Sequence, residues 1–236
     1  MPASASARSD HRPRVAAERR ARMRRKLVES ALLVFAGKGV DASVIEDVIV
    51  AAGVSRGTFY NYFRTNADLL AAVNEELNDE ISTLIKAQVR DDPDPASRQC
   101  MGFRLFVEVA RRFPLFAKFV ARAGVNVRPG SLRHVYMSPS IRAAMKNGDF
   151  IEMPLPVALD FIAGNIFAAV VCVSEDELDD NYLNALLAAT LRGVGLSDRK
   201  IGLLMAMPLK PLTLGPDTLC QRSHLLFLAR RPRKTR

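Results

Sequence analysis

The apolar positions of the chain recur at intervals of three and four residues from about residue 18 to about residue 208. This spacing is typical of helices with one buried face, and no stretch alternates apolar and polar positions as a half-buried strand would. Proline and glycine fall mainly between the periodic stretches, for example at residues 92–95 and 147–148, where they interrupt helices. The pattern predicts an all-α protein.

Residues 27–63 carry the start and stop signals of three consecutive helices. Apolar side chains from Leu27 to Phe35 share one face of the first helix, and Gly39 follows where a left-handed C-terminal cap is wanted. Ser43 and Glu46 have the spacing of a capping box, which predicts the start of a second helix.

A tight turn is predicted between the second helix and the third. Gly53 can supply the positive φ of such a turn, and Ser55 follows as the cap of a short third helix. Two short helices joined in this way form a helix-turn-helix unit, and its small core should contain Phe59 and Phe63. A fourth helix is predicted over residues 65–89.

The sequence A-A-G-V-S-R-G-T-F-Y-N-Y-F at residues 51–63 is similar to the signature of the tetracycline-repressor (TetR) family. The helix before it and the following Leu69 fall at the family's spacing, and residues 187–197 resemble the end of a family helix. The resemblance implies a homodimeric transcriptional regulator that binds double-stranded operator DNA and responds to a small-molecule effector. It implies an N-terminal three-helix helix-turn-helix domain and a larger helical effector-binding and dimerisation domain.

The third helix carries the main candidates for DNA contact. Arg56 stands near its start, where a guanidinium can donate two hydrogen bonds to guanine, while helix N-termini and short hydroxyls suit phosphate. Tyr60 and Tyr62 resemble the family's backbone-contacting aromatics. Asn66 stands where the family usually has lysine, so the resemblance implies a weaker phosphate contact there. Ile49 stands where the family usually has alanine, which implies different packing of the second helix against the third. The DNA-binding candidates are Ser43, Ser55, Arg56, Gly57, Thr58, Tyr60, Asn61, Tyr62 and Asn66.

Phenylalanines are concentrated at residues 103–119, which is most simply the core of the larger domain. The same side chains could line an apolar effector pocket, in which a few polar groups orient the ligand. Arg104 and Asn165 interrupt apolar surroundings, and each is either such a group or a satisfied structural residue. By analogy with the family, the predicted pocket residues are Phe103, Arg104, Phe106, Phe116 and Asn165.

The helices predicted at residues 157–173 and 181–194 resemble the family's two dimerising helices. Four apolar side chains on the second of them repeat at intervals of three and four residues, enough for one face. We predict that this face is the dimer interface, and the alternative is the core of a single subunit. The four residues are Leu183, Leu187, Leu191 and Val194.

The formal net charge of +9 is concentrated at the two ends of the chain. Residues 1–26 hold nine Arg and Lys side chains against two carboxylates, and residues 208–236 hold seven against one. Basic ends attract a polyanion such as DNA, and they also attract an anionic membrane.

Several other classes of protein are excluded or disfavoured. Three widely spaced cysteines and three histidines show no metal-ligand spacing, so we predict no metal, no cofactor and a reducing cytoplasm. No nucleophile and base are paired, so we predict no enzyme. Residues 155–173 approach the length of a membrane span, but Pro156, Asp160 and Asn165 count against insertion. We predict a buried or interface helix there, and no membrane.

The predicted organisation has four parts: a disordered basic arm at residues 1–17, a helix-turn-helix domain at 18–66, an effector-binding and dimerisation domain at 67–208, and an irregular basic tail at 209–236. The predicted function is ligand-responsive regulation of transcription, most simply repression, at a palindromic operator. Two alternatives stay open: a helical small-molecule or acyl-binding protein, and a nonspecific DNA-associated protein without operator selectivity.

Overall fold

The structure, a computed structural model, describes residues 11–42, 44–123, 137–175, 180–209 and 211–230. These residues form helices, turns and irregular segments without a strand, which confirms the predicted all-α class. In chain order the helices are α1 (His11–Lys38), α2 (Ile45–Ala52), α3 (Arg56–Tyr60), α4 (Asn66–Val89), α5 (Pro95–Arg112), α6 (Pro114–Ala123), α7 (Ser138–Lys146), α8 (Leu155–Ser174), α9 (Asp180–Gly193), α10 (Asp198–Ala206) and α11 (Leu219–Arg230).

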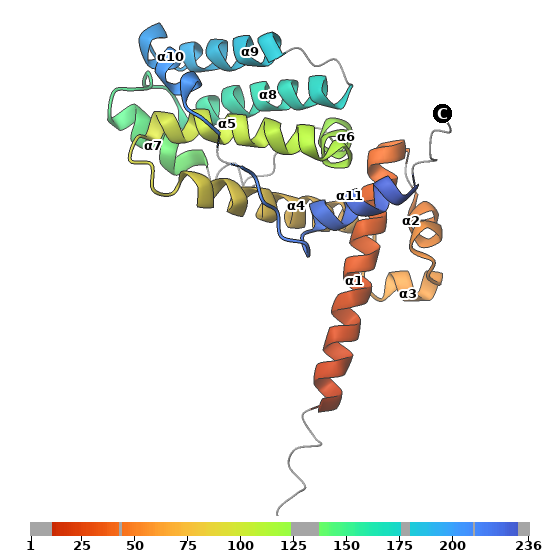
Figure 1. Cartoon of the computed structure of the whole chain (residues 1–236). Coiled ribbons are helices and arrows are strands. Elements are labelled where there is room, and N and C mark those ends of the chain that lie inside the picture. Colours follow the sequence, from red (N-terminus) through yellow and green to blue (C-terminus); the bar gives the residue numbers. More distant parts are fainter. Residues whose placement is uncertain (1–10, 43, 124–136, 176–179, 210, 231–236) are drawn as a thin grey trace, which may run out of the picture.

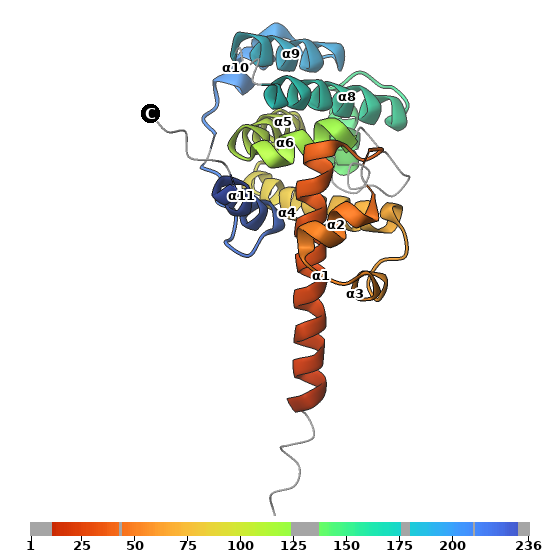
Figure 2. The same ribbon diagram turned by 90° about the vertical axis from the view of Figure 1, so that its right-hand side faces the viewer.

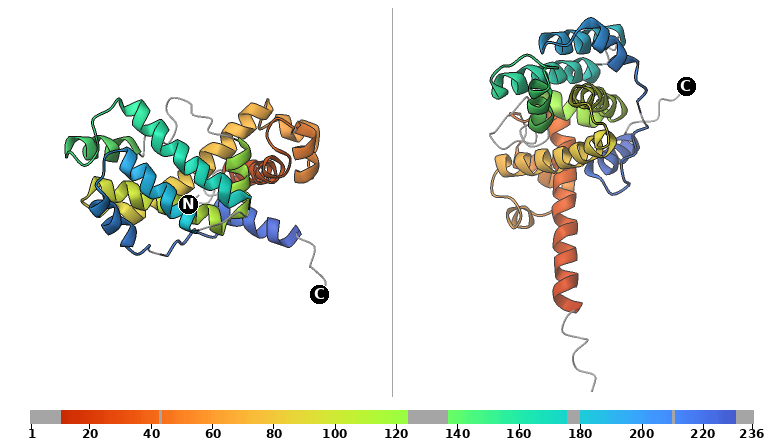
Figure 3. Two further views of the ribbon diagram at one scale, coloured as in Figure 1. Left: turned by 90° about the horizontal axis from the view of Figure 1, so that it is seen from above. Right: turned by 90° about the vertical axis from the view of Figure 1, so that its left-hand side faces the viewer.

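The helices form a small head and a larger body (Figures 1 and 2). α1 is a long rod whose N-terminal half projects away from the rest of the molecule, and α2 and α3 lie beside it. The C-terminal half of α1 packs on α6 and α4 of the body. Figure 3 shows α8 and α9 at the end of the body farthest from the projecting half of α1.

α1 begins earlier than the sequence pattern predicted. It starts at His11, so residues 11–17 are helical and not part of an irregular arm. Alanine, arginine and glutamate are good helix formers, and the Arg14 guanidinium pairs with the Glu18 carboxylate one turn later, with Nε and Oε1 3.1 Å apart. The remaining residues of the predicted arm, 1–10, lie outside the described residues.

α4 begins where the sequence predicted the fourth helix. The Thr65 hydroxyl accepts a hydrogen bond from the Asp68 amide at 3.0 Å, and the Asp68 carboxylate accepts from the Thr65 amide at 3.1 Å. This reciprocal capping box satisfies two amides that a helix start leaves without intrahelical partners. The start of α4, the helix that links the head to the body, is therefore set by local signals in the sequence.

The predicted irregular tail contains a helix, α11, and this prediction is corrected. The Glu80 carboxylate of α4 accepts hydrogen bonds from the amides of Leu219 (2.5 Å) and Cys220 (3.1 Å), and so caps the N-terminus of α11. Burial raises the pKa of Glu80, although the two amides act to lower it. Leu219 and Cys220 are buried, and α11 packs against α1, α4 and α6. The cap lies 139 residues from α11 in the sequence, which is why no local pattern revealed it.

The predicted dimer-interface residues on α9 form part of the core of one subunit. Leu183, Leu187, Leu191 and Val194 are all buried within the single chain, between 1% and 8% exposed. They are covered because this face of α9 packs onto α8, α5 and α10. The assignment of these four side chains to a dimer interface is therefore corrected to the alternative, an intramolecular core.

Among the described residues, α8 is the one helix that could cross a membrane by length and hydropathy. Length and composition are weak signals of a span, because a core helix passes the same test. α8 packs against α5, α6, α7 and α9, and it buries Ala158, Leu159 and Ile162 in the body.

Candidate nucleic-acid interface

The second helix of the head starts at Ile45, with Val44 as its cap residue. Asp47 accepts a hydrogen bond from the Val44 amide at 3.2 Å, so Asp47, and not Glu46, is the acidic residue that caps this helix. A hydrogen bond from the Lys38 ammonium, with Nζ and Oδ1 2.5 Å apart, lowers the pKa of Asp47, as does the Val44 amide. Ser43, the predicted partner of Glu46 and a predicted DNA contact, lies outside the described residues.

The turn between α2 and α3 has the predicted left-handed glycine. Gly53 has φ 58° and ψ 49°, a conformation that costs a residue with a side chain about 1–2 kcal/mol. The amide of Val54 donates back to the carbonyl of Ile49 at 3.2 Å, which closes the C-terminus of α2. The Ser55 hydroxyl then accepts from the Thr58 amide at 3.1 Å and caps α3, as predicted.

α3 is anchored by two aromatic side chains. Phe59 is fully buried and Phe63 nearly so, with their ring centroids 6.2 Å apart. They belong to the same core as Phe35 of α1, Val48 of α2 and Leu69 of α4. A helix of five residues has little stability by itself, so this packing holds α3 in place.

The solvent-facing side of α3 gathers most of the predicted DNA-contact residues. Gly57 leaves open space on this side, since a Cβ there would find only the Ser55 hydroxyl oxygen, at 4.0 Å. A bare backbone of this kind lets another molecule approach closely. Ser55, Arg56, Gly57, Tyr60 and Asn61 are exposed, whereas Thr58, Tyr62 and Asn66 are partly buried.

The Arg56 guanidinium has a partner that sequence reasoning missed. Its Nη2 lies 2.6 Å from Oε1 of Glu46, at the start of α2. Both side chains are more than half exposed, so the ion pair contributes only about 0–1 kcal/mol. Such a weak ion pair can orient the guanidinium toward solvent and can still break when Arg56 binds a DNA base. No local pattern indicates it, because the turn between α2 and α3 creates the contact.

Two arginines of α1 stack on aromatic side chains that follow α3. The Arg20 guanidinium lies 5.8 Å from the ring centroid of Tyr62, and that of Arg24 lies 5.7 Å from the centroid of Phe63. Cation–π contacts of this kind are worth about 0.5–1 kcal/mol at exposed sites. They join the basic part of α1 to the helix-turn-helix unit, so the two form one surface.

The predicted effector-pocket residues have structural partners in the body. Phe103 and Phe116 are buried, and Phe106 packs edge-on against Phe116 with ring centroids 5.5 Å apart. Arg104 donates to the carbonyl of Met207 at 2.6 Å, and Asn165 donates to the carbonyl of Phe161 at 2.7 Å, one turn earlier in α8. These contacts are those of core and structural polar residues, the alternative left open by the sequence.

Two cavities lie elsewhere on the described part of the chain, and none of the predicted effector residues lines either of them. One, of about 470 Å³, lies between α1 and α11, and the other, of about 410 Å³, lies between α4 and residues 213–218. Within the described ranges, no group of three or more His, Cys, Asp or Glu side chains could hold a metal ion. Burial raises the pKa of the Cys100 thiol to about 11, which makes it unreactive at neutral pH.

Comparison with known proteins places the head in a recognised family. Residues 27–73 match the family described as "Bacterial regulatory proteins, tetR family". The chain is 35% identical over 69 residues to YvdT of Bacillus subtilis (strain 168), an uncharacterised HTH-type transcriptional regulator, and the match covers 29% of this chain and 36% of YvdT. It is 29% identical over 81 residues to DhaR of Mycobacterium sp. (strain GP1), an HTH-type transcriptional repressor, covering 34% and 41%.

These matches span only about two fifths of the relatives' own length or less. The similarity in fold extends much further. The crystal structure of RolR in complex with resorcinol superposes with a TM-score of 0.59 at 23% identity, over 84% of this chain and all of that one. Over most of its length, this chain therefore shares the fold of RolR.

Proposed function

The chain belongs to the TetR family of bacterial regulatory proteins, and from this premise we propose that it is a ligand-responsive transcriptional repressor acting on a palindromic operator as a homodimer. The observation that carries the proposal is the exposed face of α3, which a buried aromatic pair holds in place. α3 enters the major groove, where Arg56 reads a base edge and Tyr60 contacts the backbone. The protein acts in the cytoplasm, without a catalytic activity or a cofactor of its own.

The dimer forms through the outer face of α8 and α9, the side opposite the buried leucines. Val157, Phe161 and Tyr182 are large apolar or aromatic side chains exposed on this side. A Cβ at Gly193 would come within 2.6 Å of the Phe161 ring, so the glycine lets α9 lie close against this ring. The outer face carries further small residues at helical spacing: Gly164 and Ala168 on α8, and Ala185 and Ala189 on α9. An apolar surface of this kind supports a two-fold contact between subunits.

The effector is a small molecule that binds in the body and shifts the protein between two arrangements of the heads. RolR, which shares the fold, was solved with resorcinol, and this supports a small organic effector here. Arg122 of α6 donates to the carbonyl of Ala36 at 2.8 Å, and it also donates to the carbonyl of Gly37. These bonds join the body to the C-terminal end of α1, so a displacement of α6 would reach the head. A ligand that binds the DNA-incompetent arrangement more tightly then releases the operator.

Selection of bound sites from a random duplex library tests the proposal directly. The selected sequences should contain an inverted repeat whose half-sites are centred about one helical turn apart, roughly 34–36 Å. A two-fold dimer with two recognition helices requires this symmetry. Recovery of no consensus would support the nonspecific DNA-associated alternative, and failure to retain any duplex would reject DNA binding.

On the selected operator, Arg56→Ala should cost about 1–3 kcal/mol of binding free energy and relax the preference at one base position per half-site. Tyr60→Phe should weaken binding to all sequences alike, since a lost phosphate contact carries no sequence information. The measurement is a titration of each variant against the operator and its single-base variants. Unchanged affinity and selectivity of Arg56→Ala would show that Arg56 does not read a base.

A further inference from the structure

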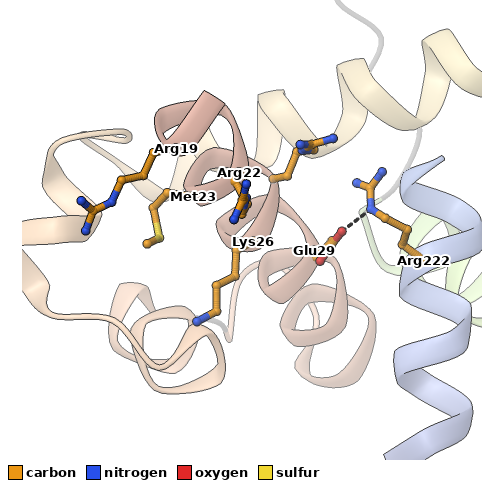
Figure 4. A pocket seen from close by; sticks show the side chains of 7 residues that line it. Arg19, Arg22, Met23, Lys26, Glu29 and Arg222 are labelled. Atoms are coloured by element: carbon orange, nitrogen blue, oxygen red, sulfur yellow. Dashed lines mark hydrogen bonds and ion pairs between the residues drawn. The ribbon is translucent and has the colours of Figure 1, made fainter. Parts of the chain in front are cut away.

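The α1–α11 groove is lined by charged side chains from opposite ends of the chain. It is lined by Arg19, Arg22, Met23, Arg25, Lys26 and Glu29 of α1 and by Arg222 of α11, and its volume is about 470 Å³ (Figure 4). The lining thus contains five basic side chains and one carboxylate. That carboxylate, Glu29, is already paired with Arg222 across the groove.

The cations of α1 crowd one another without compensation. Arg22 lies three residues after Arg19, and Arg25 and Lys26 lie three and four residues after Arg22, so the four share one side of the helix, and all four are exposed. None of them forms an ion pair with a carboxylate of the described residues. Like charges at this spacing destabilise an isolated helix by about 0.2–0.5 kcal/mol per pair. The fold does not relieve the repulsion among these four side chains. Unrelieved repulsion of this kind is expected at a functional site where a bound partner supplies the opposite charge.

The second wall of the groove is held rigidly in place. Arg222 pairs with Glu29 of α1 and lies 3.5 Å from Glu76 of α4, which is also within 3.6 Å of Arg24. Phe113 packs edge-on against His224 with ring centroids 5.3 Å apart, which fixes the middle of α11 on the body. α11 is therefore fixed beside the basic side of α1, with the charge of Arg222 matched by Glu29 and Glu76.

We propose that the α1–α11 groove binds the phosphate backbone of the duplex beside the segment that α3 reads, so that the C-terminal helix is part of the DNA-binding surface. This rests on the proposed function. The same turns of α1 carry Arg20 and Arg24, which stack on Tyr62 and Phe63, so the part of α1 that lines the groove also contacts the helix-turn-helix unit. A groove lined by positive charges and by few hydrogen-bond acceptors suits the regularly spaced phosphates of a DNA backbone. Contacts to phosphates carry no information about the base sequence.

The salt dependence of binding to a mixed-sequence duplex tests the groove. The triple variant Arg19→Gln, Arg22→Gln and Arg25→Gln should reduce the slope of log K against log salt by about 0.9 for each lost phosphate contact, thus by about 2.7 if all three make one. The matched control, Arg142→Gln, Lys146→Gln and Arg199→Gln, removes the same charge from exposed positions on α7 and α10. Its slope should stay close to that of the unmodified protein.

A tethered cleavage reagent tests the part played by α11. Leu225 and Leu203 are both well exposed, on α11 and α10 respectively. In a Cys172→Ser background, an iron chelate attached at Leu225→Cys should cleave the bound duplex, and the same chelate at Leu203→Cys should not. If the triple variant folds poorly, the single variant Lys26→Gln replaces it in the salt titration, where it should reduce the slope of log K against log salt by about 0.9.

The outcomes separate the groove from the function on which it rests. If the unmodified protein does not bind the duplex, the proposed function fails. If it binds, but the triple variant and the control have equal slopes, or Leu225→Cys does not cleave, the groove proposal alone is overturned. Groove-dependent binding to phosphatidylserine vesicles with an unaltered DNA slope would also overturn it, in favour of a membrane surface.

Discussion

Replacing Phe161 by glutamate is expected to convert the proposed dimer into folded monomers. Phe161 is 39% exposed in the single chain and is not one of the buried core residues, although its ring lies against Gly193, so the subunit should stay folded after the substitution. In the dimer, each subunit would bring a carboxylate into the contact, because an isologous interface repeats every change, at a cost of several kcal/mol. Operator affinity should then fall toward the nonspecific level, a loss of at least about 10³-fold.

Sedimentation measures the oligomeric state, and circular dichroism measures the helical content of the same sample. The control is Leu225→Glu, which places a carboxylate at an exposed apolar position on α11, away from α8 and α9. That variant should remain dimeric. A dimeric Phe161→Glu protein with a monomeric Leu225→Glu protein would move the interface to α11.

The double variant Leu187→Glu and Leu191→Glu is expected to unfold the body. Both leucines are 3% exposed, so the two carboxylates would be buried among apolar side chains without a partner. Each buried charge costs several kcal/mol, and the whole protein is expected to be stable by about 5–15 kcal/mol. Thermal melting followed by circular dichroism should show loss of the cooperative transition or a large fall in the melting temperature.

The control for this variant uses the other side of the same helix. Ala185 and Ala189 are exposed on α9, and the double change Ala185→Glu and Ala189→Glu should leave the subunit folded. Because these alanines lie on the proposed contact face, the control should lose its dimer while keeping its helices. If the leucine variant were instead a cooperatively folded monomer, Leu187 and Leu191 would belong to the dimer interface and not to the core of one subunit.

The turn of the helix-turn-helix unit and the start of α3 were predictable because their signals are local, whereas the capping role predicted for Glu46 belongs to Asp47. Gly53 and Ser55 each act within three or four residues along the chain, and the glycine turn and the serine cap occur as predicted. The start of α4 near residue 65 also occurs as predicted, and it too rests on a local contact, between Thr65 and Asp68. Phe59 and Phe63 were recognisable as core because their spacing matches a helix with one buried face. The partner of Arg56 was not predictable, since Glu46 reaches it only through the fold of the turn.

The sequence by itself determined the all-α class, the helix-turn-helix unit and the two helices, α8 and α9, that carry the proposed interface. Periodicity identifies that a helix has an apolar face, but it cannot say whether a neighbour in the same chain or in another covers it. For Leu187 and Leu191 only the packing of α9 on α8 decided this. α11 depends on Glu80, and the α1–α11 groove depends on Arg222 meeting Glu29, 193 residues away. Such contacts arise only when the whole chain has folded, because no local propensity encodes them.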